Sequence, residues 1–213
     1  MADAPGNLRI IDHPLAAVWL SRLRSRTTGT EDFRKDLQNI SLLLLVEASR
    51  SWPVSAFSIE TPLTSCDGCA VGAPIVLVPI LRAGLGMLDG ILPFLPEARV
   101  GHLGLYRDET TLRPVTYYSR LPTNVTDAQV LLLDPMLATG YSACEAVSIL
   151  KARGAERIQF ICVLACPAGI AQLQSAHPGV PIITAAIDPE LNDAGYIVPG
   201  LGDAGDRYFG TTH

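Results

Sequence analysis

The chain has little charge and no excess of basic residues. Only 17% of its 213 residues are charged, and 16 Lys and Arg against 21 Asp and Glu give a net charge of −5 at pH 7. Proteins that bind nucleic acid usually present clustered Lys and Arg, so we expect no nucleic-acid partner. Hydrophobic residues make up 48% of the chain, which excludes a disordered protein and supplies a sizeable core.

Long apolar runs and a targeting segment are also missing. The longest apolar run near the start, residues 42–46, is far shorter than a membrane span. Residues 1–6 are short, polar and acidic, unlike a signal peptide. We therefore expect a cytoplasmic protein with no membrane association.

Cysteine is present in an odd number that argues against a disulfide framework. The five cysteines are Cys66, Cys69, Cys144, Cys162 and Cys166, which we interpret as reduced thiols. Cys66 and Cys69 form a CxxC pair, but a zinc ribbon needs a second pair. Since Asp67-Gly68 between them is typical of a hairpin turn, we expect residues 64–73 to form a turn-rich hairpin without a metal.

The pattern of apolar residues predicts one domain over residues 1–213 that begins with a helical arm, about residues 11–50. Helices are expected over residues 11–24 and 30–50, the second with Thr30 as its N-cap. The arm precedes any predicted sheet, so we expect it to cover a sheet edge or contact another subunit.

Strands then alternate with helices, which is typical of an α/β fold with a doubly wound, mainly parallel sheet. Residues 53–60 alternate like a half-buried strand, and buried strands are expected over residues 74–79, 130–133, 157–165 and 181–187. Strand-like runs on both sides of a polar loop predict a β-hairpin flap over about residues 104–120, with a solvated loop as the alternative.

The stretch 130–151 predicts a strand, a phosphate-sized loop and a helix. Asp134 follows the strand, where open α/β sheets bind ligands. The small residues 138–142 then lead into a helix, whose N-terminal N–H groups favour anions. Gly and Thr in such a loop also serve turn geometry alone, so the local pattern leaves both interpretations open.

Two further loops carry polar residues with glycine. Arg82 follows the strand at residues 74–79, either as part of a site or as half of a surface ion pair. Residues 188–210 combine Gly, Pro and Asp with aromatic residues, which indicates an ordered loop that walls a site. Within it, Asp206 and Arg207 are expected to form a structural ion pair.

Together these loops resemble the uracil phosphoribosyltransferases, of the type I phosphoribosyltransferases. The matching stretches are Val-Pro-Ile-Leu-Arg-Ala-Gly-Leu-Gly-Met at 78–87, Asp-Pro-Met-Leu-Ala-Thr-Gly at 134–140 and Gly-Tyr-Ile-Val-Pro-Gly-Leu-Gly-Asp-Ala-Gly-Asp-Arg at 195–207. The resemblance extends over nearly the whole chain from His13. It implies transfer of a ribose 5-phosphate group from phosphoribosyl diphosphate to uracil in pyrimidine salvage, with Mg²⁺ as cofactor, GTP as an effector and a homodimer or higher homo-oligomer.

The resemblance also implies the site residues. Arg82, Asp134 and Asp203 are the expected catalytic residues. Mg²⁺ would rest mainly on the diphosphate, with a water-mediated contact to Asp203 and no direct protein ligand assigned. The residues expected to bind phosphoribosyl diphosphate are Arg82, Arg107, Asp134, Pro135, Met136, Leu137, Ala138, Thr139, Gly140, Tyr141, Ser142 and Asp203. Those expected to bind uracil in a tail of about residues 188–210 are Ile197, Gly202, Asp203 and Ala204.

One residue departs from the family's phosphate loop. Tyr141 stands where the family usually has a second glycine, and a positive φ there would strain it; we expect Tyr141 to point outward. Two other functions compete: a nucleotide-sensing RNA-binding regulator on the same fold, which the net charge of −5 opposes, and a transferase for another nucleobase.

Overall fold

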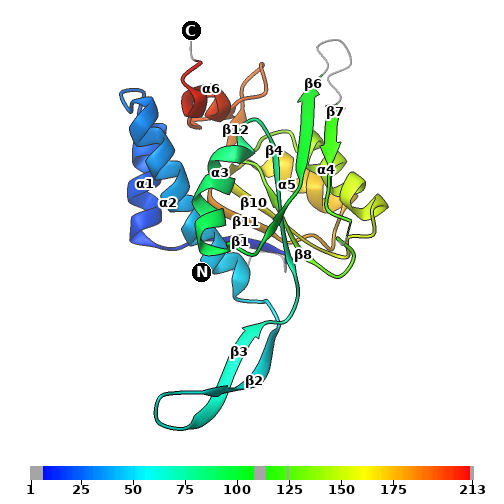
Figure 1. Ribbon diagram of the computed structural model, residues 1–213. Helices are drawn as coiled ribbons and strands as arrows, with labels where there is room; N and C mark the ends of the chain where they lie inside the picture. Colours follow the sequence, from blue (N-terminus) through cyan, green and yellow to red (C-terminus); the bar gives the residue numbers. More distant parts are fainter. Residues whose placement is uncertain (1–6, 108–113, 124, 212–213) are drawn as a thin grey trace.

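The computed structural model describes residues 7–107, 114–123 and 125–211. Figure 1 shows the arrangement of the elements, which follow the expected alternation of strands and helices. The strands are β1 (Leu8–Ile10), β2 (Val54–Glu60), β3 (Ser65–Val71), β4 (Ile75–Leu81), β5 (Arg99–Val100), β6 (His102–Arg107), β7 (Pro114–Arg120), β8 (Gln129–Leu133), β9 (Met136–Leu137), β10 (Arg157–Ala165), β11 (Ile182–Ile187), β12 (Glu190–Leu191) and β13 (Ile197–Val198). The helices are α1 (Pro14–Arg24), α2 (Thr30–Ser49), α3 (Gly84–Ile91), the 3₁₀ helix η1 (Leu92–Phe94), α4 (Tyr141–Ala152), α5 (Pro167–Ala176) and α6 (Ala204–Phe209).

A mainly parallel sheet forms the centre of the molecule. Its strand order is β1-β11-β10-β8-β4-β6-β7, with the short β5 and β9 paired to β4 and β10. The pairings are parallel except that of β6 with β7. The predicted doubly wound parallel sheet is therefore confirmed. Because β4, β8 and β10 run the same way, their carboxyl ends share one edge, the place where such sheets bind ligands.

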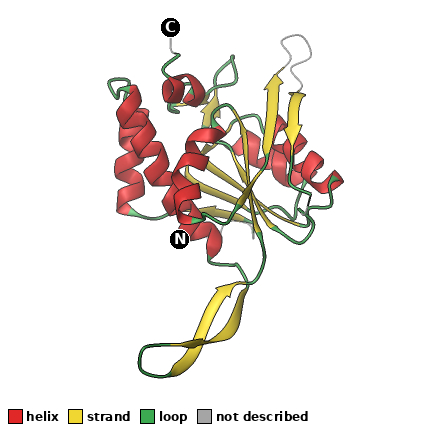
Figure 2. Ribbon diagram, in the orientation of Figure 1, coloured by secondary structure: helices red, strands yellow, loops and turns green. Residues whose placement is uncertain are grey.

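Helices cover both faces of this sheet, α1, α2 and α3 on one side and α4 and α5 on the other (Figure 2). Successive side chains of a strand point to opposite faces of the sheet, so each strand contributes to a core on both faces. In β8, Leu131 packs into the core that contains Leu37 of α2. Its neighbour Val130 packs into the opposite core with Val147 of α4. All four side chains are fully buried, so the continuous apolar strand reflects burial on both faces.

The helical arm packs on a face of the sheet, so the expected cover of a sheet edge is wrong, and the alternative of a contact with another subunit stays a prediction. Helix α2 lies against α3 and against β10 and β11. The expectation that the arm precedes any sheet is also wrong, because β1 pairs in parallel with β11 ahead of α1. β1 could not be predicted from the sequence, because a strand of three residues is too short to show a periodic pattern and its partner lies far along the chain. Gly29, not Thr30, occupies the N-cap of α2.

Strands β2 and β3 form an antiparallel hairpin that projects away from the body (Figure 1). β2 is exposed along its whole length, so the predicted half-buried strand is wrong. The predicted turn is wrong as well: Asp67 and Gly68 lie inside β3, opposite Ser58 and Phe57. The chain turns instead near Thr61, whose N–H donates to the carbonyl of Thr64 at 3.0 Å. Because the turn lies at residues 61–64, β2 and β3 can pair over seven residues each.

Strands β6 and β7 pair as an antiparallel hairpin in the region expected to form the flap. Residues 108–113, which join them, lie outside the described part of the chain. In the ranges that the structure does describe, no helix is both long and apolar enough to span a bilayer.

Candidate active site

Three loops meet at the carboxyl edge of the sheet, after β4, after β8 and before α6. The first two touch closely, since a Cβ at Gly84 would come within 2.4 Å of the carbonyl oxygen of Leu133. The first and third also touch, because a Cβ at Gly205 would lie 3.8 Å from that of Ala83. Glycine at position 84 permits the first approach, whereas the second is an ordinary van der Waals contact. The loop after β4 and the start of α6, whose residues Arg82 and Asp206 are 124 positions apart in the chain, thus form one surface.

A hollow of about 340 Å³ opens where the first loop, the flap and the tail converge. It brings the sequence-predicted Arg82 and Asp203 together across one space. The residues that line it are Leu81, Arg82, Ala83, Leu105, Tyr106, Tyr117, Asp203 and Gly205. Asp134 and residues 138–142 are not part of this lining; Asp134 follows β8, the strand that pairs with β4 in the sheet.

Asp134 follows β8 directly and lies in surroundings of low polarity. Its Oδ1 accepts a weak hydrogen bond from the N–H of Met136 at 3.4 Å. Burial raises the pKa of Asp134 to about 7, and the bond from Met136 opposes the rise. The side chain is half-buried, so water still reaches part of the carboxyl and limits this effect. Among the described residues this carboxyl has no ion pair, and such a carboxyl at a strand end is suited to accept hydroxyl hydrogen bonds.

The segment that follows Asp134 is attached to β10. The carbonyl of Pro135 accepts from the N–H groups of Val163 and Leu164 at 2.9 and 3.0 Å. The thiol of Cys166 donates to the carbonyl of Ala138 at 2.9 Å. These bonds hold the predicted phosphate loop rigidly against the sheet.

Helix α4 begins at Tyr141 without a side-chain cap hydrogen bond at its N-cap, Gly140. Gly140 has a φ of 82°, in the left-handed region, and a Cβ there would come within 2.8 Å of the carbonyl oxygen of Gly169. The positive φ thus falls on Gly140 and not on Tyr141, which is helical. Tyr141 is 47% exposed, which confirms that it points outward. The first-turn N–H groups and the positive helix end suit an anion such as phosphate.

Arg82 forms an ion pair with Asp206 of α6. The Nη2 atom of Arg82 lies 2.8 Å from Oδ1 of Asp206, and its guanidinium lies 5.8 Å from the ring centroid of Phe209. The predicted Asp206–Arg207 ion pair is therefore wrong, since Arg82 takes that carboxylate. Arg207 instead donates to the backbone carbonyls of Leu23, Ser25 and Leu201.

The tail is anchored by a partly buried ion pair that sequence reasoning missed. Both terminal nitrogens of Arg24 donate to the carboxylate of Asp188 at 2.6 Å. One of them, Nη1, also donates to the carbonyl of Gly200 at 2.9 Å. The N–H of Gly200 donates back to Asp188. Burial alone would raise the pKa of Asp188, but the hydrogen bonds from Arg24 and Gly200 outweigh it and lower that pKa. No local signal links two residues so distant in sequence.

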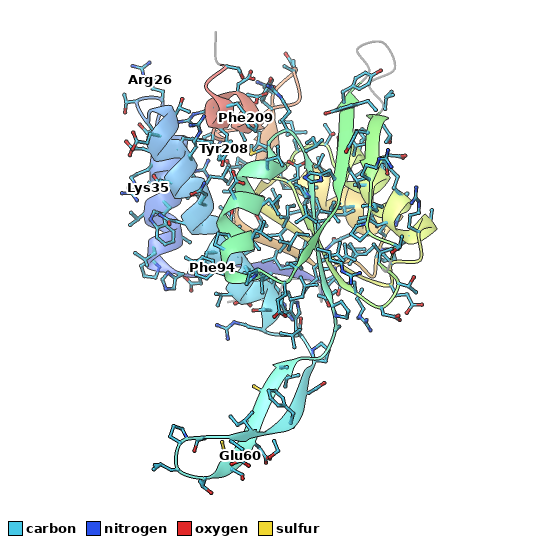
Figure 3. The ribbon with its side chains drawn as sticks, viewed as in Figure 1. Arg26, Lys35, Glu60, Phe94, Tyr208 and Phe209 are labelled. Atoms are coloured by element: carbon cyan, nitrogen blue, oxygen red, sulfur yellow. The ribbon has the colours of Figure 1, made fainter. Side chains whose placement is uncertain are left out.

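The expected uracil-binding residues lie around the start of α6. Ile197 and Ala204 are buried, while Gly202 and Asp203 are exposed. Asp203 caps α6, its Oδ1 accepting the N–H of Asp206 at 2.8 Å. Tyr208 and Phe209 pack the end of α6 against the core below it (Figure 3). The hydroxyl of Tyr208 donates to Asp89 of α3.

Arg107 ends β6, opposite Pro114 of β7. Its side chain lies outside the described part of the structure, so its expected role stays a prediction. Two residues that sequence reasoning did not assign, Tyr106 and Tyr117, line the hollow from the flap, with ring centroids 6.1 Å apart. Their place in the predicted flap was the signal that could have found them.

Comparison with known proteins identifies the family. The model of the uracil phosphoribosyltransferase family matches residues 10–211. The chain belongs to the uracil phosphoribosyltransferase family. A uracil phosphoribosyltransferase of Dictyoglomus thermophilum is 52% identical over 203 residues, which cover 95% of this chain and 98% of that protein. The family assignment makes the chain a pentosyltransferase.

Solved structures support the fold. A protein of Aquifex aeolicus is 35% identical and superposes with a TM-score of 0.91 over 96% of this chain and 99% of its own. The adenine phosphoribosyltransferase of Leishmania donovani is 15% identical, with a TM-score of 0.60 over 88% of this chain and 86% of its own. The second likeness shows only that uracil phosphoribosyltransferases share the type I phosphoribosyltransferase fold with it.

Proposed function

We propose that this uracil phosphoribosyltransferase joins uracil to 5-phospho-α-D-ribose 1-diphosphate, giving UMP and diphosphate in pyrimidine salvage. The N1–C1′ bond forms, the C1′–O bond to diphosphate breaks, and the N1 proton passes to solvent. The observation that carries the proposal is the meeting of Arg82 and Asp203 across one hollow, at the sheet edge where Asp134 and the N-terminus of α4 follow the neighbouring strand β8.

The sugar phosphate would lie between Asp134 and α4. The first-turn N–H groups of α4, with the hydroxyls of Thr139 and Ser142, suit the 5′-phosphate. The carboxyl of Asp134 would accept hydrogen bonds from the ribose hydroxyls and hold C1′ for attack. The bonds that fix Pro135 and Ala138 to the rest of the molecule support this pre-organised placement.

The diphosphate would lie near Arg82, where its developing charge meets a fixed cation. Arg107 is proposed to approach from the flap. Among the described residues no group of three or more His, Cys, Asp or Glu side chains could hold a metal ion. Mg²⁺ is commonly bound by one or two carboxylates together with substrate phosphates, and the exposed Asp203 fits that pattern. When bound, Mg²⁺ would neutralise charge on the diphosphate.

Uracil would lie along the tail, at Ile197, Gly202, Asp203 and Ala204. Its edge offers amide-like donors and acceptors, which backbone N–H and C=O groups can pair. Gly202 has a φ of 78°, a conformation that lets the backbone approach a ligand. The alternatives gain no specific support from the structure, neither an RNA-binding regulator nor a transferase for another nucleobase.

A GTP effector site is part of the proposal. A hollow of about 460 Å³ lies between the α1–α2 connection and the tail, with the arginines Arg24, Arg26 and Arg207 in its lining. Arginine forks suit phosphate groups, and Arg26 is the candidate ligand, because Arg24 and Arg207 already donate to Asp188 and to backbone carbonyls. The hollow adjoins the uracil-binding tail through Gly202, so a bound polyphosphate could bias that loop.

A homodimer or higher homo-oligomer is proposed through the β2–β3 hairpin. Phe57 and Ile59 lie on one face of it and are 50% and 37% exposed, and Leu63 is 95% exposed. Glu60 lies near the far end of the hairpin, away from the body (Figure 3). An isolated two-stranded hairpin is marginally stable in water, so a second copy that covers it would stabilise it in a closed pair.

A cytoplasmic location completes the proposal. Phosphoribosyl diphosphate carries several negative charges and does not cross a bilayer unaided. An enzyme that consumes it belongs where it is made.

An assay of base preference tests the function. The protein is mixed with phosphoribosyl diphosphate, Mg²⁺ and one of uracil, hypoxanthine, adenine or orotate. UMP from uracil, without nucleotide from the other bases, is expected. Nucleotide formed from another base, with none from uracil, would refute the proposal.

A further inference from the structure

The Arg82–Asp206 ion pair has the character of a temporary contact. We propose that Asp206 is an exchangeable counter-ion, which pairs with Arg82 at the hollow until the diphosphate of the substrate takes its place. The inference rests on the proposed function, because it assumes that Arg82 binds the diphosphate.

Asp206 is the fixed member of the pair. Its Oδ1 also accepts a hydrogen bond from the hydroxyl of Thr211 at 2.6 Å, and its N–H donates to Asp203 at 2.8 Å. Arg82 is the movable member, since its side chain is 55% exposed against 32% for Asp206. A long exposed side chain changes rotamer at little cost. Arg82 can therefore exchange partners while α6 stays in place.

The Arg82–Asp206 ion pair is weak enough for Arg82 to exchange its partner. Ion pairs exposed to this degree are weak, because water screens the charges and the long side chain loses freedom when it is held. The Arg24–Asp188 pair is the contrast within the same molecule: it is bidentate, with side chains only 26% and 6% exposed. The first contact is weak enough to yield to a polyanion, and the second is not.

Exchange leaves Arg82 paired before and after binding. In the free protein the carboxylate keeps the guanidinium at the rim of the hollow, over Phe209. When the diphosphate binds, the bond to Asp206 breaks and bonds to phosphate oxygens form. The carboxylate thus competes with the substrate, so its removal should tighten binding of the diphosphate.

The test is a double-mutant cycle read by calorimetry. Binding of phosphoribosyl diphosphate with Mg²⁺ is measured for the wild type, Asp206→Asn, Arg82→Ala and the double variant. Asparagine keeps an acceptor for Thr211 and removes the charge. Ribose 5-phosphate, which lacks the diphosphate, serves as the control ligand. Asp127→Asn, an exposed change of equal charge just ahead of β8, serves as the control variant.

Asp206→Asn should bind phosphoribosyl diphosphate about two- to five-fold more tightly, the range that an exposed ion pair supports. The KM for phosphoribosyl diphosphate should fall while that for uracil stays constant. In the Arg82→Ala background the gain should disappear, and neither ribose 5-phosphate nor Asp127→Asn should show it. Unchanged or weaker binding, an equal gain with ribose 5-phosphate, or a gain that persists without Arg82 would overturn the inference.

Failure of the inference can be told from failure of the proposed function. UMP formation by the wild type is measured on the same preparation. If UMP forms and the cycle shows no coupling, only the role of Asp206 falls. If no UMP forms, the proposed function falls, whatever the cycle shows.

Discussion

Arg24 donates two hydrogen bonds to the carboxylate of Asp188, which lies 164 positions further along the chain. Both residues also bond to Gly200, one to its carbonyl and the other to its N–H. One ion pair therefore connects the end of α1, the end of β11 and the tail. The shape of the proposed uracil-binding loop depends on a residue of the helical arm.

Breaking this pair should weaken both the fold and uracil binding. Asp188→Asn leaves Arg24 partly buried without its charge partner, at a cost of about 1–3 kcal/mol in the free energy of unfolding. The KM for uracil should rise several-fold more than that for phosphoribosyl diphosphate. Urea unfolding and steady-state kinetics measure the two effects.

Glu47→Gln is the matched control, because it breaks the ion pairs of Glu47 with Arg50 and Arg9, two arginines with largely exposed side chains. Such a pair contributes less than about 1 kcal/mol, so kinetics and stability should stay near those of the wild type. Equal KM changes for both substrates in Asp188→Asn would contradict a specific role in the tail.

Asp134 should make the stability of the free protein depend on pH. Its pKa is raised from 3.8 to about 7, so the folded state holds a proton that the unfolded chain releases at lower pH. This contribution to stability is fully present below pH 3.8 and is lost as pH rises through about 7. Asp134→Asn cannot ionise, so its advantage in stability over the wild type should grow from pH 5 to pH 8.

Between pH 5 and pH 8 the difference in the free energy of unfolding between Asp134→Asn and the wild type should grow by on the order of a few kcal/mol. Partial exposure of the residue to solvent limits the difference. Urea unfolding at several pH values, without substrate, measures it. Asp127→Asn, at an exposed carboxyl, should show the same dependence of the free energy of unfolding on pH as the wild type. A difference between Asp134→Asn and the wild type that is the same at pH 5 and pH 8 would show that Asp134 ionises normally.

Gly140→Ala should impair the phosphate loop through its backbone. The φ of 82° and the contact of a Cβ with the carbonyl of Gly169 at 2.8 Å predict a loss of about 1–3 kcal/mol in stability. Because the strain acts at the N-terminus of α4, the KM for phosphoribosyl diphosphate should rise about ten-fold or more.

Gly154→Ala provides the control for strain away from the site. Gly154 follows the other end of α4 and has a φ of 87°, so its substitution should reduce stability as well. Its KM for phosphoribosyl diphosphate should stay close to that of the wild type. A similar KM increase in both variants would mean that α4 as a whole, and not its N-terminus, sets the affinity.

The β2–β3 hairpin should control assembly. Phe57→Ser and Ile59→Ser replace exposed apolar side chains, so they should leave the fold of one copy intact and weaken self-association. Sedimentation velocity should show a shift toward the single copy for the double variant, and none for Ser58→Ala on the opposite face. An unchanged sedimentation coefficient for the double variant would rule out this face as the interface.

The loops that carry chemistry were predictable because each lies beside a strong local signal. Asp134 follows four apolar residues and precedes proline, so a strand end was evident there. That inference needed only the neighbours of Asp134. The outward position of Tyr141, which is confirmed, was expected from the family resemblance and not from its neighbours.

The features that could not be predicted depend on distant partners. β2 alternates like a half-buried strand, yet nothing in its own pattern tells whether the body covers it. The partner of Asp206 is Arg82, 124 positions away, whereas reasoning from neighbours favoured Arg207. Tertiary contacts decided both cases.

Phosphorus NMR of one reaction mixture tests the central claim most directly. The protein is incubated with Mg²⁺ and phosphoribosyl diphosphate, first alone and then with uracil. We predict that free diphosphate and UMP appear together in equal amounts, only after uracil is added. Diphosphate released without uracil, or no reaction when uracil is present, would contradict the claim.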